Sequence, residues 1–137
     1  MPAYDINIQI VPATKYTGMA FYSFGQKRSL GVRGIQKLVN IFAKYLLTPV
    51  GTDYTDLSYG TNLTTLIGSN VVLDDAREIL DMAVDATVAA IQAAQAGQAS
   101  VPDDERLAAA AVTNYIEIPD APGFSAQVLI TNVANQQ

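Results

Sequence analysis

The sequence predicts a small, single α+β domain, because strand-like and helix-like patterns occupy separate parts of the chain. Apolar and polar residues alternate near the start, and apolar residues recur at helical spacing in the middle. Two further alternating stretches joined by a Pro/Gly turn close the chain. A length of 137 residues suits one domain. We expect an N-terminal strand and aromatic loop (1–31), a helical part (32–96), and an acidic cap with a C-terminal hairpin (102–137), all within a single domain over 1–137.

The N-terminal strand is expected over residues 4–11, where isoleucine occupies every second position from Ile6 to Ile10 and Pro12 follows. Residues 13–31 are rich in aromatic residues and glycine, which predicts a loop or an irregular strand. The aromatic rings there either cover the core or bind a partner, and packing on the core is the simpler interpretation.

An amphipathic helix is expected over residues 32–47, followed by Thr48-Pro49 and Gly51 as helix-ending residues. Its core face carries five apolar residues at helical spacing: Ile35, Leu38, Val39, Phe42 and Leu46. The opposite face carries the polar residues Arg33, Lys37, Asn40 and Lys44. The basic residues of that face form either a contact surface or an ordinary solvated helix face.

A short helical turn and then a long helix are expected to follow. The turn carries Leu63, Leu66 and Ile67, and the long helix runs from Leu73 to about Ala96 with Gly97 at its C-terminal cap. The long helix should bury six residues: Ile79, Leu80, Ala83, Thr87, Ala90 and Ile91. Its second half is mostly Ala and Gln, which permits close packing against another helix but is also simply favourable for helix formation.

A C-terminal β-hairpin is expected, because residues 112–118 and 125–133 alternate between apolar and polar and are separated by the Pro/Gly turn 119–123. Two acidic clusters, Asp74-Asp75 and Asp103-Asp104-Glu105, stand where a turn or a helix is expected to begin. We interpret their carboxylates as helix caps, since acids at a helix start satisfy free N–H groups and the helix dipole.

The composition excludes most catalytic chemistries. The chain has no His, Cys or Trp, which removes Ser-His-Asp and Cys-His catalysis, His/Cys zinc sites and disulfides. Carboxylate chemistry is left, and a glycosidase would need two carboxylates across a cleft. The sequence contains neither an EF-hand pattern nor a glycine-rich phosphate loop. We therefore expect a protein that is not an enzyme and that uses no metal or cofactor.

The charge is distributed unevenly along the chain. Residues 1–50 carry a net charge of +5, and residues 51–137 carry −10, which indicates either two differently charged solvated faces or a charge-matched assembly surface. The basic residues are scattered and the whole chain is net −5, so nucleic acid is not an expected partner. No signal-peptide pattern or membrane-spanning stretch is visible, so we expect a soluble protein of cytoplasmic origin with no membrane partner.

Three motifs occur in an order that is found in a known family. The first two are Tyr45-Leu46-Leu47-Thr48-Pro49-Val50-Gly51 and Tyr59-Gly60-Thr61-Asn62-Leu63 with Leu66-Ile67 after it. The third is Asp104-Glu105-Arg106-Leu107, directly before the strand pair. Together they resemble the contractile-tail sheath initiators, the gene-25-like baseplate wedge proteins that have carried a lysozyme-like label. The resemblance covers residues 30–135, with Thr52-Asp53 in place of the family's Glu-Arg, and Asp104-Glu105 in place of Glu-Pro in its Glu-Pro-Arg-Ile signature.

The resemblance implies a structural protein of the virion tail baseplate, in a phage or a related injection machine, made in the host cytoplasm. In similar proteins the signature arginine anchors the protein to a helical bundle of other wedge subunits. This would make a wedge anchor of the four residues Asp104, Glu105, Arg106 and Leu107. Several copies are expected per baseplate, about six by its rotational symmetry.

The resemblance also implies that strands of the first sheath ring extend the C-terminal strand, which is β-augmentation. No charged residue occurs between Phe124 and Gln137, so the usual protection of a free strand edge is missing there. Alternatively, the N-terminal strand or a loop covers that edge. The expected docking residues are Ser125, Gln127, Val128, Leu129, Ile130, Thr131 and Val133.

Two other functions stay open at this point. The acidic clusters are compatible with a carboxylate-dependent cell-wall glycosidase, although the sequence indicates no sugar-binding groove. The chain is also compatible with another structural protein of the tail, such as a connector or a tube-end protein.

Overall fold

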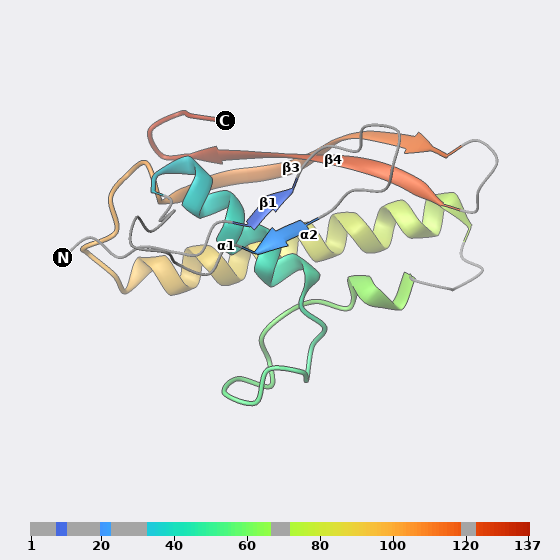
Figure 1. The fold of residues 1–137 in the computed structure, drawn as a ribbon, viewed down its shortest axis with the longest axis horizontal. Helices are drawn as coiled ribbons and strands as arrows, with labels where there is room; N and C mark the ends of the chain where they lie inside the picture. The colour runs from blue at the N-terminus through green and yellow to red at the C-terminus, as the bar shows by residue number, and fades with distance from the viewer. Residues whose placement is uncertain (1–7, 11–19, 23–32, 67–71, 119–122) are drawn as a thin grey trace.

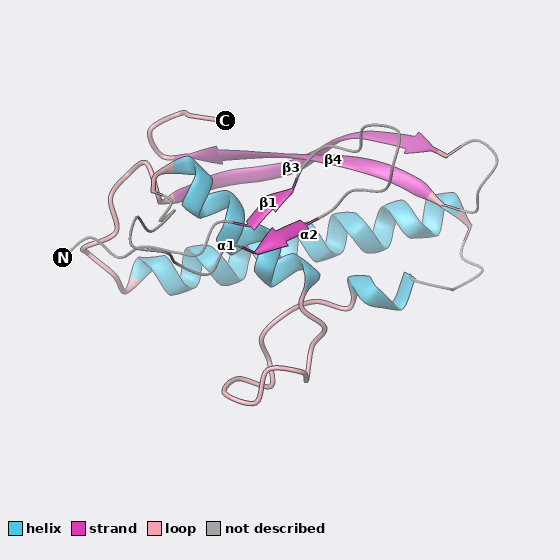
Figure 2. Cartoon of the chain, viewed as in Figure 1, coloured by secondary structure: helices cyan, strands magenta, loops and turns pink. Residues whose placement is uncertain are grey.

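A long β-hairpin lies across two helices and forms the upper of two layers (Figures 1 and 2). The computed structural model describes residues 8–10, 20–22, 33–66, 72–118 and 123–137. Its elements in chain order are β1 (Ile8–Ile10), β2 (Ala20–Tyr22), α1 (Ile35–Leu47), the 3-10 helix η1 (Leu63–Leu66), α2 (Leu73–Ala96), β3 (Leu107–Glu117) and β4 (Phe124–Asn132). The predicted α+β fold is confirmed. In the described ranges, neither helix is both long and apolar enough to span a membrane.

The N-terminal part contributes two short strands. β1 and β2 pair antiparallel with each other, and the hairpin β3–β4 forms a sheet of its own. The predicted N-terminal strand is confirmed over Ile8–Ile10, and the stretch predicted as a loop or irregular strand contains β2. The other residues of 1–32 lie outside the described residues.

Helix α1 forms as the apolar spacing predicts, but it begins three residues later. Gly34, with φ +62°, precedes Ile35, and Thr48 ends the helix by donating its side-chain hydroxyl to the Lys44 carbonyl at 2.6 Å. The predicted core face packs inward. The predicted polar face is wrong at two positions, because Asn40 is only 3% exposed and Lys37 is half-buried.

Helix α2 has the predicted bounds, and its apolar stripe is longer than the prediction. Leu80, Ala83, Thr87 and Ile91 are buried as expected, but Ile79 and Ala90 are only half-buried. The helix also buries Ala76, Val84 and Gln95. No side chain caps the N-terminus of α2, so the first-turn acids Asp74 and Asp75 favour the helix through its dipole, and Asp74 also pairs with Arg77 at 3.8 Å. Gly97 ends the helix with φ −82°, a conformation open to any residue.

The hairpin is longer than predicted on its first strand, which begins at Leu107 and not at residue 112. The alanines at 108–111 are good helix formers, but here they are strand residues opposite β4. Two register shifts, between Leu107 and Ala109 and between Val112 and Asn114, each add one residue to β3. These β-bulges keep Leu107, Val112 and Tyr115 on the inner face although their spacing is irregular.

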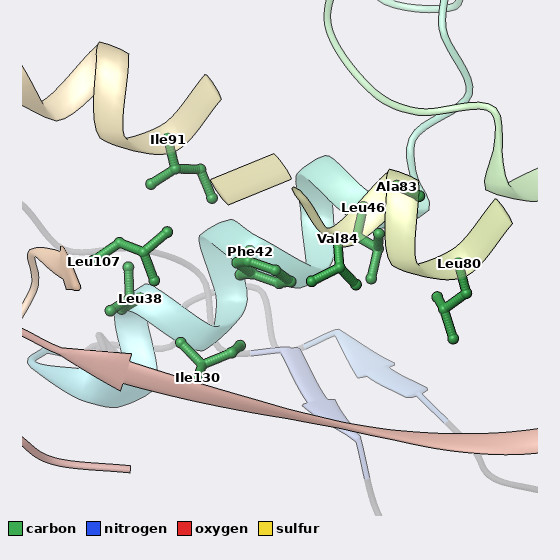
Figure 3. Close-up of a cluster of buried hydrophobic side chains, with 9 residues drawn as sticks. All are labelled: Leu38, Phe42, Leu46, Leu80, Ala83, Val84, Ile91, Leu107 and Ile130. Carbon is green, nitrogen blue, oxygen red and sulfur yellow. The ribbon is translucent and has the colours of Figure 1, made fainter. Parts of the chain in front are cut away.

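The core lies between the helices and the inner face of the hairpin. Phe42 of α1 lies among side chains from both helices and both strands of the hairpin (Figure 3). α1 contacts α2 and β4, and α2 contacts β3, so each helix supports one strand. The buried cluster consists of Leu38, Phe42, Leu46, Leu80, Ala83, Val84, Ile91, Leu107 and Ile130.

The connection after α1 projects from the helical layer and is closed at its base by backbone contacts (Figure 1). The Thr61 N–H donates to the Thr48 carbonyl at 2.9 Å, and the Thr61 hydroxyl donates to the Leu46 carbonyl at 2.7 Å. Gly60 has φ +107°, and a Cβ there would lie 2.2 Å from the Thr48 carbonyl oxygen. Only glycine therefore fits where the two ends of this loop meet.

We predict that Gly60→Ala lowers the free energy of unfolding by about 2 kcal/mol or more, because the methyl group meets backbone and the left-handed conformation is strained. Urea denaturation followed by circular dichroism measures the change. Gly97→Ala is the matched control, since a Cβ there meets nothing within 4 Å and φ is −82°. Equal stability of the two variants would contradict the loop closure described above.

Candidate docking site in the hairpin and the preceding turn

The acidic cluster at 103–105 forms a tight turn that leads into β3. The Glu105 N–H donates to the Pro102 carbonyl at 3.0 Å, and the Arg106 N–H donates to the Asp103 carbonyl at 3.4 Å. No helix begins here, so the interpretation of these three acids as helix caps is wrong. The turn instead reverses the chain after α2, so that β3 runs back along that helix.

Glu105 joins this turn to the start of α1. Its carboxylate accepts a hydrogen bond from Lys37 Nζ at 2.7 Å and another from the Gly34 N–H at 3.3 Å. Glu105 is 8% exposed, so its ion pair with Lys37 and its bond to the Gly34 N–H are both shielded from water. Lys37, predicted as part of a basic contact surface, is therefore paired within the chain, whereas Arg33 and Lys44 are exposed.

Arg106 closes the C-terminal end of α2. Its guanidinium donates to the carbonyls of Gln95 at 3.3 Å, Gln98 at 3.3 Å and Val101 at 3.0 Å. A cation at this end of a helix satisfies free carbonyls and complements the helix dipole. These contacts order the turn around Arg106. They occupy guanidinium N–H donors that the family resemblance predicted would contact a wedge subunit.

Two buried amides complete the junction, and neither was among the site residues predicted from the sequence. Gln95 donates to the Glu105 carbonyl at 2.9 Å and accepts from the Leu107 N–H at 2.8 Å. Asn132 is fully buried and donates to the Asp104 carbonyl at 2.8 Å. Gln95 lies four residues after Ile91 on the apolar stripe of α2, and this position was the signal that its side chain points inward.

The four residues predicted as the wedge anchor therefore differ in accessibility. Leu107 is buried in the core, and Glu105 is buried against α1. Arg106 is half-buried against the end of α2, and Asp104 is half-buried beside Gly34. Of the acidic residues in this turn, Asp103 alone is exposed.

We predict that Glu105→Ala lowers the free energy of unfolding by about 3 kcal/mol, because it leaves the Lys37 ammonium and the Gly34 N–H without their carboxylate. Chemical denaturation measures the loss, and adding Lys37→Met should recover part of it by removing the second charge.

Asp74→Ala is the control for this prediction. Asp74 also forms an ion pair, with Arg77 at 3.8 Å, but its side chain is exposed. Its removal should cost less than about 1 kcal/mol. A loss of that size for Glu105→Ala would contradict a structural role for the buried pair.

The predicted docking residues of β4 divide between two faces. Even-numbered residues point toward the helices, so Val128 is half-buried and Ile130 is buried. The odd-numbered residues point away from the helices; Leu129 is 40% exposed and Val133 is 44% exposed. Five of the seven residues thus lie on the outer face or just after it: Ser125, Gln127, Leu129, Thr131 and Val133.

The backbone of β4 has a regular outer edge. The Val133 N–H donates to the Arg106 carbonyl, and the Gln127 carbonyl accepts the Thr113 hydroxyl, so odd-numbered residues bond toward β3. Because backbone groups alternate along a strand, Ala126 and Val128 direct their N–H and C=O groups to the opposite edge. No third strand pairs with this edge among the described residues.

The two edges of the hairpin are not equivalent. Both bulges lie in β3, where the extra residues Ala108 and Thr113 interrupt its ladder, and β4 has no insertion. Bulges are a common means of blunting a strand edge. The hairpin also has no charged side chain over 107–116 or 124–132. The β4 edge is therefore uninterrupted as well as uncharged, whereas the β3 edge is interrupted by two bulges.

Tyr115 fastens the far half of the hairpin to α2. Its hydroxyl donates to Asp81 at 2.5 Å, and the guanidinium of Arg77 lies 5.1 Å from its ring centroid. Burial, together with the hydrogen bond to the Asp81 carboxylate, raises the pKa of Tyr115 from 10.0 to about 12. The folded hairpin thus favours the protonated phenol over the phenolate.

We predict that Tyr115→Phe reduces stability by about 1 kcal/mol near neutral pH, because the bond to Asp81 is lost. As the pH rises through about 10 toward 12, the unfolded chain releases the Tyr115 proton before the folded protein does, so the parent protein loses this advantage. The stability difference between parent and variant should shrink in that window. Tyr54→Phe, at a 93% exposed residue, is the control, and a constant difference would contradict the assignment.

No family model, curated protein or solved structure matches the chain. Among the described residues, no group of three or more acidic side chains converges in a way that could hold a metal ion. The site is therefore characterised by its own geometry: an ordered turn at one end and an open, uncharged strand edge along its length.

Proposed function

We propose that the protein is a structural component of a contractile-tail baseplate, in a phage or a related injection machine. It links the baseplate wedge to the first ring of the tail sheath and initiates sheath assembly by β-augmentation at β4. The single observation that carries this proposal is the regular, uncharged outer edge of β4, together with the bulged edge of β3.

An added strand would gain affinity chiefly through main-chain hydrogen bonds. Phe124, Ala126, Val128 and Ile130 direct their backbone groups to the free edge, and each bond contributes about 0.5–1.5 kcal/mol. This mode does not require particular side chains on the incoming strand. It suits a contact that must be repeated around a ring of identical sheath subunits.

The end of the hairpin that faces the ordered turn is the proposed wedge side. The junction of Glu105, Arg106, Gln95 and Asn132 fixes the direction in which the hairpin leaves the helices. We propose that the wedge contacts this end of the domain, with Arg33 as an exposed cation beside the start of α1, whereas Lys44 lies in the last turn of that helix. Arg106 then acts by holding the turn in shape, in addition to any direct contact.

We predict that Ala126→Pro abolishes binding of the sheath protein encoded in the same genome and leaves the domain folded. Proline removes an N–H that faces the free edge of β4, so the ladder to β3 is preserved while the added strand loses a donor. Co-expression with the sheath protein, followed by size-exclusion chromatography and electron microscopy, measures the association.

Ala110→Pro is the matched control, because Ala110 occupies the equivalent inward-facing position on β3, with its N–H on the opposite edge. This variant should bind sheath protein as the parent does, and circular dichroism checks that both variants are folded. Normal binding by folded Ala126→Pro protein would reject the β4 edge as the docking site.

A further inference from the structure

A second surface lies on the opposite side of α2, away from the hairpin. A hollow of about 400 Å³ opens between this helix and the segment after α1. Ile79, Met82 and Ala86 line it from α2, and Val50 and Leu63 line it from the facing segment. Met82 is 64% exposed and Val50 is 45% exposed, so apolar surface is left in contact with water there.

The α2 side of the hollow is apolar and has acidic residues beside it, and the facing segment also lines it with Gly60, Thr61, Asn62 and Thr65. On α2, the exposed residues Asp75, Glu78 and Asp85 lie within one helical turn of Ile79 or Met82. Asp53 and Asp56 belong to the projecting loop of the facing segment and do not line the hollow.

The two loop carboxylates are held in their ionised form. Hydrogen bonds from Thr55 lower the pKa of Asp53, and hydrogen bonds from Ser58 lower the pKa of Asp56. Lys44 is the cation that contributes to this effect at Asp53. Arg77, the basic residue of α2, instead lies over the Tyr115 ring on the hairpin side of the helix.

This charge pattern selects among possible occupants. A second copy of the chain would bring an identical acidic border against the first, and like charges in contact are unfavourable. A partner with apolar side chains on one face and Lys or Arg on either side is complementary at both the centre and the border. A methionine at the centre of the groove adapts to such a face, because its side chain is flexible and polarizable.

We propose that this groove between α2 and the 50–65 segment binds a cationic amphipathic helix of a partner protein. The anchors would be apolar residues at the i, i+3 or i+4, and i+7 positions of that helix, seated over Met82 and Ile79. The proposal is independent of sheath docking at β4, because the two surfaces lie on opposite sides of α2.

The test uses a synthetic helical peptide of ~18 residues (about five turns) made only of Leu and Lys, with Leu on one face. The control peptide carries Glu in place of Lys. In an NMR titration of the ¹⁵N-labelled protein, the Lys peptide should shift the amide signals of residues 79–86 and 50–65, and the Glu peptide should not. Shifts that centre on the hairpin, or equal binding of both peptides, would overturn the proposal.

Two pairs of variants then test the centre and the border separately. Met82→Ser should weaken binding of the Lys peptide about five- to tenfold, and Ile116→Ser, at a 50% exposed apolar residue of β3, should not.

Glu78→Gln should weaken binding and reduce its salt dependence, whereas Asp103→Asn, which removes the same charge elsewhere, should leave both unchanged. Unaltered affinity in Met82→Ser would overturn the proposal.

Discussion

The buried carboxylate of Glu105 is the contact on which the arrangement of the domain depends. It binds Lys37 and the Gly34 N–H, and so joins the start of α1 to the turn between α2 and β3. Gln95 and Asn132 bind the backbone on either side of the same turn. The start of α1, the end of α2 and the two strands of the hairpin thus meet at one polar junction. Because a buried charge is costly without its partners, separating these elements would leave the Glu105 carboxylate unpaired.

The hairpin extends from this junction, and its two sides differ. Its inner face completes the core over both helices, and its outer face and edges carry no charge over 107–116 and 124–132. The bulges of β3 serve both sides, since they bring Val112 and Tyr115 back to the core and interrupt the outer ladder of that strand. Packing and edge protection are therefore coupled on β3, and β4 is left as the regular edge that the proposed function requires.

Much of the candidate site could be predicted from the sequence, and the remainder depended on partners distant along the chain. The period-2 alternation of 125–133 identified β4 and its outward residues, because a strand places every second side chain on one face. The strand at 108–111 was missed, because four alanines favour a helix unless a neighbouring strand supplies hydrogen bonds. Glu105 was interpreted as a cap, since only the fold brings Lys37, 68 positions earlier, to its carboxylate.

The sequence by itself determined the fold class, the bounds of α2, the core face of α1 and the presence of a C-terminal hairpin, because these follow from local periodicity and turn residues. The tertiary structure alone decided which polar residues are buried. Lys37 and Asn40 lie on the face that periodicity assigns to solvent, and Gln95 lies on an apolar stripe. The physical reason is that burial of a polar group depends on whether a partner meets it across the fold, and that pairing is set by three-dimensional packing and not by spacing along one element.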